Sequence, residues 1–311
     1  MMPAAACSDE EFIGLFTQFG AAQTARQLCI SPRDVYRRRD RLEQKYGRPI
    51  LSPAQAPTDN HPERQPVELE SGVVLVASDA HYWPGPASTA HRAFVQACKM
   101  MAPKVVIMNG DVFDGAKISR HAPIGWEDCP SVDQEIEACS ERLQEILDAS
   151  PNAKHIWTLG NHDARFESRL ANVASEYAKV NGVHLKDHFP EWIPCWSAWV
   201  NDVVVKHRFK GGIHATHNNT LTAGKSMVTG HLHSLKVTPY SDLNGTRWGV
   251  DTGTLADVYG PQFRDYMEDN PRNWRSGFAV LTFYRGELLW PEVVHVRAPG
   301  EVEFQGKVWE V

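Results

Sequence analysis

The chain has 311 residues, of which 42% are hydrophobic and 23% are charged, and its formal net charge is −6 at pH 7. This composition is typical of a folded globular protein and excludes a chain that is disordered throughout. It contains no run of about 18 apolar residues, so we expect no membrane-spanning helix and no membrane partner. The six cysteines form no C-x-x-C pair and the first residues do not resemble an export signal, which favours a reduced, cytoplasmic protein.

Residues 1–47 are predicted to form a small all-α domain. Apolar residues recur at helical spacing in three successive stretches, and Ser31 followed by Pro32 marks the start of the third helix. Serine caps helix N-termini, and proline fits the first helical position because no N–H is needed there. The second and third stretches resemble the helix-turn-helix of DNA-binding regulators, which places its second helix in a major groove. That resemblance makes five side chains candidate DNA contacts: Arg33, Tyr36, Arg37, Arg38 and Arg41.

The charge of this segment leaves a second interpretation open. Residues 1–50 hold 8 Lys/Arg against 6 Asp/Glu, a net charge of +2, whereas the other residues hold 24 against 32, a net charge of −8. A local basic excess favours nucleic acid as a partner, because cations that contact phosphates supply most non-specific affinity. Small three-helix units also serve in docking or oligomerisation, so a homo-oligomer is the alternative expectation.

Residues 48–66 contain five prolines and little aliphatic pattern, which predicts an extended, semi-rigid linker. From residue 67 to 311 the pattern changes to strands that alternate with helices, near 87–101, 132–149 and 163–181, and then becomes rich in strands. This pattern predicts an α/β domain in which two sheets face each other and helices cover the outside.

Polar clusters follow three of the predicted buried strands. Asp79 and His81 come after the apolar run 73–76, Asp111 and Asp114 come after 105–108, and Asn161-His162-Asp163 comes after 155–159. Residues two apart on an extended strand point to the same side, so Asp79 and His81 are expected to reach one ion.

Histidines complete this pattern in the strand-rich half. His231 and His233 repeat the spacing of two residues, and His207 ends the buried-strand pattern 203–206. His214 and His217 also precede the pair, but they lie among glycines and asparagines that favour a loop, so His207 is preferred as a ligand.

These residue types suit a catalytic metal site. Asp111 has two carboxylate oxygens and could bridge two cations about 3.5–4 Å apart, and Asn161 adds an amide oxygen. Imidazole with carboxylate oxygen suits manganese, iron or zinc better than calcium, and it differs from the thiolate set of a structural zinc.

In this order, Asp-x-His, Gly-Asp-x-x-Asp, Gly-Asn-His-Asp, a strand-end His and Gly-His-x-His resemble the calcineurin-like metallophosphoesterases over roughly residues 70–260. The resemblance implies a four-layer α/β/β/α sandwich with two divalent ions, Mn²⁺ first, with Fe, Zn, Ni or Mg as alternatives. It assigns one ion to Asp79, His81, Asp111 and His233 and the other to Asp111, Asn161, His207 and His231.

The same resemblance assigns roles around the metals. His162 would be the general acid, Asp163 would orient it, and Asp114 would support a ligand. Candidate substrate contacts are Arg165, at the start of a helix that faces the metals, and Arg120 and His121 in the loop after Asp114.

The implied activity is hydrolysis of a phosphodiester, with nucleic acid as the expected substrate, by attack of a metal-bound hydroxide. A short helix-turn-helix before the phosphoesterase, with segments 251–255 and 276–280 after it, resembles phage or prophage members of the family, so the expected location is the cytoplasm of a bacterial or phage-infected cell. Two alternatives stay open: a small-molecule or nucleotide phosphatase or phosphodiesterase that uses the helical unit for assembly, and a non-catalytic DNA-binding protein.

Overall fold

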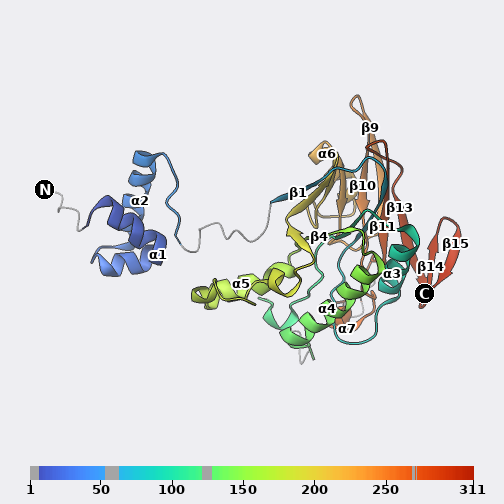
Figure 1. The fold of residues 1–311 in the computed structure, drawn as a ribbon, viewed down its shortest axis with the longest axis horizontal. Coiled ribbons are helices and arrows are strands. Elements are labelled where there is room, and N and C mark those ends of the chain that lie inside the picture. The colour runs from blue at the N-terminus through green and yellow to red at the C-terminus, as the bar shows by residue number, and fades with distance from the viewer. Residues whose placement is uncertain (1–6, 53–62, 121–127, 268–269, 271) are drawn as a thin grey trace. The chain divides into compact units, whose positions relative to one another are not determined.

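The computed structural model describes residues 7–52, 63–120, 128–267, 270 and 272–311 (Figure 1). The chain divides into two compact units, Met1–Asn60 and His61–Val311, and each is described by itself. Among the described helices, none combines the length and the apolar character that a membrane crossing requires.

The first unit contains α1 (Asp9–Gln27) and α2 (Pro32–Tyr46). Gly20 interrupts α1 with a φ of 72°, so the unit has the three predicted helical segments. Ser31 caps α2 by accepting a hydrogen bond from the Asp34 backbone N–H, and Pro32 is in the first turn, as predicted. Phe12, Phe16, Val35 and Leu42 are among the apolar side chains of its core.

The predicted linker ends earlier than expected. Of the segment 48–66, residues 53–62 lie outside the described part of the chain, and Arg64–Val67 form strand β1. β1 pairs in parallel with β6 and is the edge strand of its sheet. An edge strand tolerates proline because one of its sides has no partner, which explains why Pro66 is compatible with a strand.

The second unit contains two sheets. The first has nine strands in the order β15-β14-β13-β11-β2-β3-β4-β5, with β12 beside β11. Its strands are β2 (Gly72–Ala77), β3 (Val105–Met108), β4 (Lys154–Thr158), β5 (Ile193–Cys195), β11 (Gly277–Tyr284), β12 (Glu287–Leu288), β13 (Glu292–Ala298), β14 (Glu301–Phe304) and β15 (Lys307–Glu310). The second has the order β1-β6-β7-β8-β10-β9, with β6 (Ser197–Val200), β7 (Val203–Val205), β8 (Ser226–Thr229), β9 (Lys236–Asp242) and β10 (Gly245–Asp251).

Helices cover the outer face of each sheet. α3 (Thr89–Met101) and α4 (Val132–Ala149) pack on the first sheet, and α6 (Ala215–Ala223) packs on β8, β9 and β10 of the second (Figure 1). The other helical segments are α5 (Asp163–Val173), α7 (Pro261–Met267), η1 (Ala116–Ile118), η2 (Ser175–Tyr177) and η3 (Leu185–His188). Two earlier expectations need correction: α5 ends at Val173 rather than near residue 181, and His217 lies in a helix rather than a loop.

Side-chain alternation along the strands builds two cores. On β2, Val74 and Val76 belong to the core between the sheets, whereas Leu75 and Ala77 belong to the core beneath α3 and α4. Both cores exclude water from the strands, so the apolar runs are continuous rather than alternating with polar residues. The predicted α/β/β/α layering is therefore confirmed.

Candidate metal centre

The polar clusters converge because the strands before them are in register. Ala77 pairs with Met108, and Met108 pairs with Trp157, so the turns after β2, β3 and β4 leave the sheet side by side. In the second sheet, Val205 of β7 pairs with Val228 of β8. The Gly230 backbone N–H also donates to the His207 carbonyl at 2.9 Å, which joins the last two turns.

The ligand residues themselves are not in extended conformation. Five of the predicted ligands have positive φ: Asp79, His81, Asp111, His231 and His233, with φ values of 54°, 41°, 51°, 69° and 54°. The expectation that Asp79 and His81 point the same way from an extended strand is therefore wrong, since β2 has ended before them. Left-handed conformation costs non-glycine residues about 1–2 kcal/mol each, and such residues often gather at functional sites.

Glycines next to the ligands allow this close packing. A Cβ atom on Gly110 would lie 2.5 Å from the ring of His207, and one on Gly160 would overlap the carboxylate of Asp111. The glycine in each of these motifs is thus required by the approach of a ligand from another strand.

The first ligand set comprises Asp79, His81 and His233, whose candidate ligand atoms all lie within 4.8 Å of one another. His233 Nε2 is 3.0 Å from Asp79 Oδ1. His81 Nε2 and His233 Nδ1 are buried and have no hydrogen-bond partner.

The second set comprises Asp111, His207 and His231, grouped within the same 4.8 Å limit. His207 Nδ1 donates to the Asn109 carbonyl at 2.7 Å, which turns Nε2 toward Asp111 Oδ2 at 3.1 Å. Asn161 adds a buried amide oxygen with no partner. His214 is exposed and His217 packs on Tyr240, so His207 alone of the three histidines joins a set.

The donor atoms fit two divalent cations. Buried polar atoms normally make a hydrogen bond, yet His81, His207, His233 and Asn161 each have one that makes none. Two of these atoms are imidazole nitrogens of the first set, and a third is an imidazole nitrogen of the second set. Together with the Asn161 amide oxygen and the carboxylates of Asp79 and Asp111, they are ligand types that divalent transition metals accept. The structure thus groups six of the seven predicted ligands into two sets, and Asn161 lies between Gly160 and His162, which both approach Asp111. The bridging role of Asp111 and the metal contact of Asn161 stay predictions.

The charges of neighbouring histidines hold Asp79 in its ionised form, and hydrogen bonds fix the position of its carboxylate. Asp79 Oδ2 accepts from the Ser78 hydroxyl at 2.5 Å and from the His231 backbone N–H at 2.8 Å, and Ser78 Oγ lies 2.6 Å from Thr252 Oγ1. Burial alone would raise the pKa of Asp79, but the charges of His233 and His207 hold that pKa at about 2. The same opposition acts on His207: burial lowers its pKa, and Asp111 and Asp79 raise it to about 10.

The carboxylate of Asp163 makes its described hydrogen bonds to groups other than the His162 ring, so the orienting role predicted for it is corrected. Its carboxylate accepts hydrogen bonds from the Trp157 indole and from four backbone N–H groups: Gly160, Asp111, Val112 and Phe113. Asp163 therefore fixes the turn that carries Asp111, and a carboxylate with five donors is needed there because each N–H is buried.

Asp114 has the contact with His162 that was predicted for Asp163. Its Oδ1 is 2.7 Å from His162 Nδ1 and 3.0 Å from His81 Nδ1, and its Oδ2 accepts from the Trp83 indole at 2.9 Å. Burial opposes ionisation of Asp114, yet the hydrogen bonds from His162 and His81 lower its pKa well below the usual range. Burial also lowers the pKa of His162, but the charge of Asp111 and the bond to Asp114 raise it overall. His162 Nε2 is left to face the site, 3.9 Å from Asp111 Oδ2.

Of the three predicted substrate contacts, one lies at the centre. Arg165 donates to the Asp114 carbonyl, and its other terminal nitrogen is 3.0 Å from His162 Nε2. Arg120 is exposed, and His121 lies outside the described residues.

Sequence reasoning missed the residues that pack around the ligands. Phe263 on α7 lies 5.1 Å from the His81 ring and 5.4 Å from the His233 ring, and Trp274 lies 4.6 Å from His233. Buried Glu135 on α4 accepts from the backbone N–H groups of Gly115 and Ala116, directly after Asp114. In the sequence, the only indication of a role for Glu135 is an acidic residue on the otherwise apolar face of the α4 segment.

Comparison with known proteins agrees with this geometry. The profile of the family described as Calcineurin-like phosphoesterase matches residues 72–274, which include every predicted ligand. The chain belongs to the calcineurin-like phosphoesterase family. It is therefore a metal-dependent phosphoesterase with a His/Asp metal centre.

Relatives of this phosphoesterase include a phage protein. The chain is 27% identical over 236 residues to the Gene 54 protein of Mycobacterium phage L5, covering 67% of this chain and 88% of that one. Among solved structures, a single mutant of Vps29 from Entamoeba histolytica matches with a TM-score of 0.37 and 15% identity. Wild-type Vps29 from the same organism, complexed with Zn²⁺, matches with a TM-score of 0.39 and 13% identity. Each match covers 76% of this chain and 96% of the other.

Proposed function

We propose that this phosphoesterase hydrolyses phosphodiester bonds in nucleic acid, with two Mn²⁺ ions as its cofactors. Asp79, His81 and His233 would hold one ion, Asn161, His207 and His231 the other, and Asp111 would contact both. Bound there, the ions would lower the pKa of water and neutralise charge on the phosphate.

The protein's own side chains would handle the proton and the phosphate. His162 would donate a proton from Nε2 to the leaving oxygen once Arg165 has moved away from that nitrogen, since Asp114 holds its Nδ1. Arg165, now beside His162 Nε2, would turn its guanidinium to a phosphate oxygen, because a guanidinium matches that geometry. Asp163 would keep the Asp111 turn fixed during this exchange.

The exposed cations on one face of α2 support nucleic acid as the substrate. Arg33, Arg37 and Arg41 are spaced four residues apart, so they share a helical face, and all three are exposed. Tyr36, 47% exposed, lies beside them. Arg38 is different: its guanidinium donates to the Cys7 carbonyl and to Asp9, and it lies 4.6 Å from the Phe12 ring centroid. We therefore remove Arg38 from the predicted DNA contacts, and the other four would meet a duplex.

A substrate panel with Mn²⁺ tests this proposal. The full chain should hydrolyse bis-(p-nitrophenyl) phosphate and DNA, and deleting residues 1–60 should slow cleavage of long DNA while the chromogenic diester is hydrolysed as before. All predicted ligands lie in the second unit, so the deletion removes none of them.

Three outcomes would contradict the proposal. Hydrolysis of monoesters alone would indicate a small-molecule phosphatase, and failure to hydrolyse any ester would indicate a non-catalytic DNA-binding protein. Loss of an oligomer on deletion, with unchanged DNA cleavage, would assign the helical unit to assembly.

A further inference from the structure

The loop between β7 and α6 places two cations and an aromatic ring beside the second ligand set. We call residues 208–211 the basic loop; it follows His207 directly. Arg208, Phe209 and Lys210 are all exposed, Phe209 by 44%. Within the described part of the chain, Arg208 makes no hydrogen bond or ion pair, and the Lys210 ammonium lies 5.7 Å from the Phe209 ring centroid.

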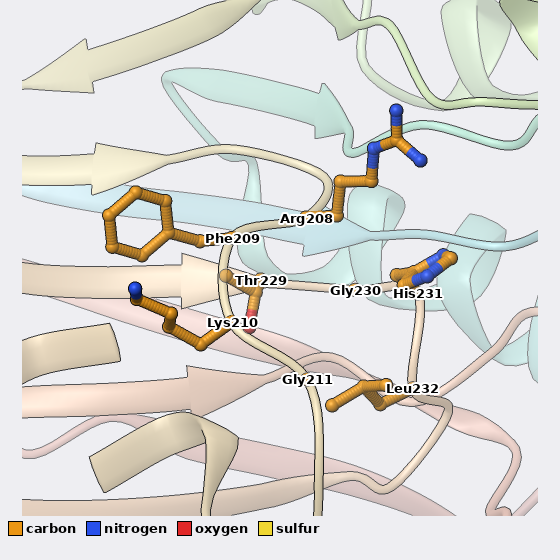
Figure 2. A pocket seen from close by; sticks show the side chains of 8 residues that line it. All are labelled: Arg208, Phe209, Lys210, Gly211, Thr229, Gly230, His231 and Leu232. Atoms are coloured by element: carbon orange, nitrogen blue, oxygen red, sulfur yellow. The ribbon is translucent and has the colours of Figure 1, made fainter. Parts of the chain in front are cut away.

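A cavity of about 130 Å³ lies between this loop and the segment 229–232, which carries the candidate ligand His231. Its lining residues are Arg208, Phe209, Lys210, Gly211, Thr229, Gly230, His231 and Leu232. Arg208 and His231 lie at one end of it, and Phe209 and Lys210 lie at the other (Figure 2). Sites that enclose a whole small molecule usually have volumes of roughly 300–1,000 Å³. This cavity therefore suits part of a larger ligand, such as a phosphate group of a chain.

The scaffold holds the basic loop in place. The Lys210 backbone N–H donates to Asn219 Oδ1 at 2.8 Å, and Asn219 is a buried residue of α6 whose amide nitrogen reaches Thr229 Oγ1 at 3.4 Å. The side chains are thus free while the backbone is anchored, which is the arrangement of a preformed binding surface.

The sequence around the basic loop contains no acidic residue. Asp and Glu make up 38 of the 311 residues, yet none occurs from Val203 to Ser241. The same 39 residues contain five cations: Lys206, Arg208, Lys210, Lys225 and Lys236. Lys225 pairs with Asp202, whereas Arg208 and Lys210 are exposed beside His231, and exposed cations of this kind attract a polyanion.

We propose that the basic loop binds a single-stranded nucleotide segment next to the phosphate being hydrolysed. Arg208 binds a backbone phosphate near His231, a base stacks on Phe209, and Lys210 neutralises the next phosphate. Cations beside an exposed aromatic ring are the usual elements of single-strand sites, because every base has a face that stacks. A paired base is already stacked in its duplex, so Phe209 selects unpaired strands. This inference rests on the proposed function, which it extends by naming the substrate class.

Binding of a single-stranded oligonucleotide tests the loop. We would measure anisotropy of a labelled phosphorothioate DNA of about 12 nucleotides, within the roughly 4–16 that single-strand sites cover, on the full chain with Mn²⁺. Phe209→Ala and Arg208→Ala should each weaken binding on the order of tenfold, and Phe209→Trp should restore it. Arg208→Ala should also reduce the slope of log K against log salt by about 0.7, the value of one phosphate contact on a single strand.

A second exposed cation–aromatic pair provides the matched control. Tyr284 is 54% exposed with the Arg285 guanidinium 5.1 Å from its ring, and it lies at the end of β11 that pairs near Gly72, opposite the metals. Tyr284→Ala and Arg285→Ala should leave binding unchanged. Normal binding by Phe209→Ala and Arg208→Ala, or an equal loss by Phe209→Ala on a duplex, would overturn the proposal.

Hydrolysis of the chromogenic diester by the same wild-type preparation separates this inference from the proposed function. If the loop variants lose binding while the wild type hydrolyses no phosphodiester, only the catalytic proposal fails. If the wild type is active and the loop variants bind normally, only the present proposal fails.

Discussion

The metal centre and the helical unit use charged side chains in opposite ways. At the centre, Asp79, Asp111 and Asp163 are fully or almost fully buried, and partners far away in the sequence hold them in place. On α2, Arg33, Arg37 and Arg41 are exposed and their arrangement follows from one helix. An unpaired buried charge destabilises the folded protein, so removing one partner at the centre should have a large effect. Each exposed cation on α2 contributes only a small part of the total attraction to a polyanion. Substitutions should therefore have large, specific effects at the centre and small, salt-dependent effects on α2.

Asp111→Asn should have the largest effect. Asp111 Oδ1 accepts from the His162 backbone N–H at 2.8 Å, and Oδ2 faces His207 at 3.1 Å, so both oxygens lie in the site. We expect the variant to lose more bound manganese than any other single ligand substitution, measured by elemental analysis, and to lose hydrolysis with it. Asp202→Asn, an exposed carboxylate paired with Lys225, is the control and should keep both ions. Retention of both ions by Asp111→Asn would remove Asp111 from the bridging position.

His162→Ala should keep the metals and lower kcat by about 10²–10⁴-fold, because only a proton donor is removed. Asp114→Asn should cost less, about 10–100-fold, since it weakens the hold on His162 Nδ1 and His81 Nδ1 without removing either ring. Steady-state kinetics with metal analysis would measure both. A larger loss for Asp114→Asn than for His162→Ala would reverse their roles.

Glu135→Gln should change the pH dependence of stability. Burial, and then the charge of Asp114, raises the pKa of Glu135 to about 7, compared with 4.5 for an ordinary glutamate. A carboxyl group with a raised pKa in the folded state stabilises the protein below pH 4.5 and loses that contribution as pH rises through 7. Wild type should therefore lose about 3 kcal/mol more than Glu135→Gln between pH 4 and pH 8 in the free energy of unfolding. Denaturant titrations of the two metal-loaded proteins would measure this difference. If their free energies of unfolding change in parallel with pH, Glu135 is ionised throughout and the prediction is wrong.

Arg37→Ala and Arg41→Ala should have the smallest effects. Each should weaken duplex binding by the full chain a few-fold and reduce the salt slope by about 0.9, as expected for one phosphate contact. Arg48→Ala removes an equally exposed cation beyond α2 and should change neither quantity. Equal effects of all three substitutions would indicate general charge attraction rather than a DNA-binding face.

The sequence alone predicted most of the strands, the layering and the candidate ligands that the structure groups at the metal centre. Apolar runs such as 73–76 predict buried strands because both faces are covered, and the glycine and polar residues after them mark the turns where the ligands lie. The helix start at Ser31-Pro32 could also be predicted from nearby residues, since capping depends on neighbouring backbone groups.

Only the tertiary structure decided which polar residue supports which. Asp163 and Asp114 both follow a ligand within three residues, and nothing local assigns one to the Asp111 turn and the other to His162. The positive φ values of the ligands, the Phe263 and Trp274 contacts and the cavity beside Arg208 likewise depend on segments far apart in sequence. The periodicity of apolar residues indicates which face of a helix or strand is buried. Hydrogen bonds between the segments that follow different strands depend on the register of those strands, and that register is set when the two sheets pack.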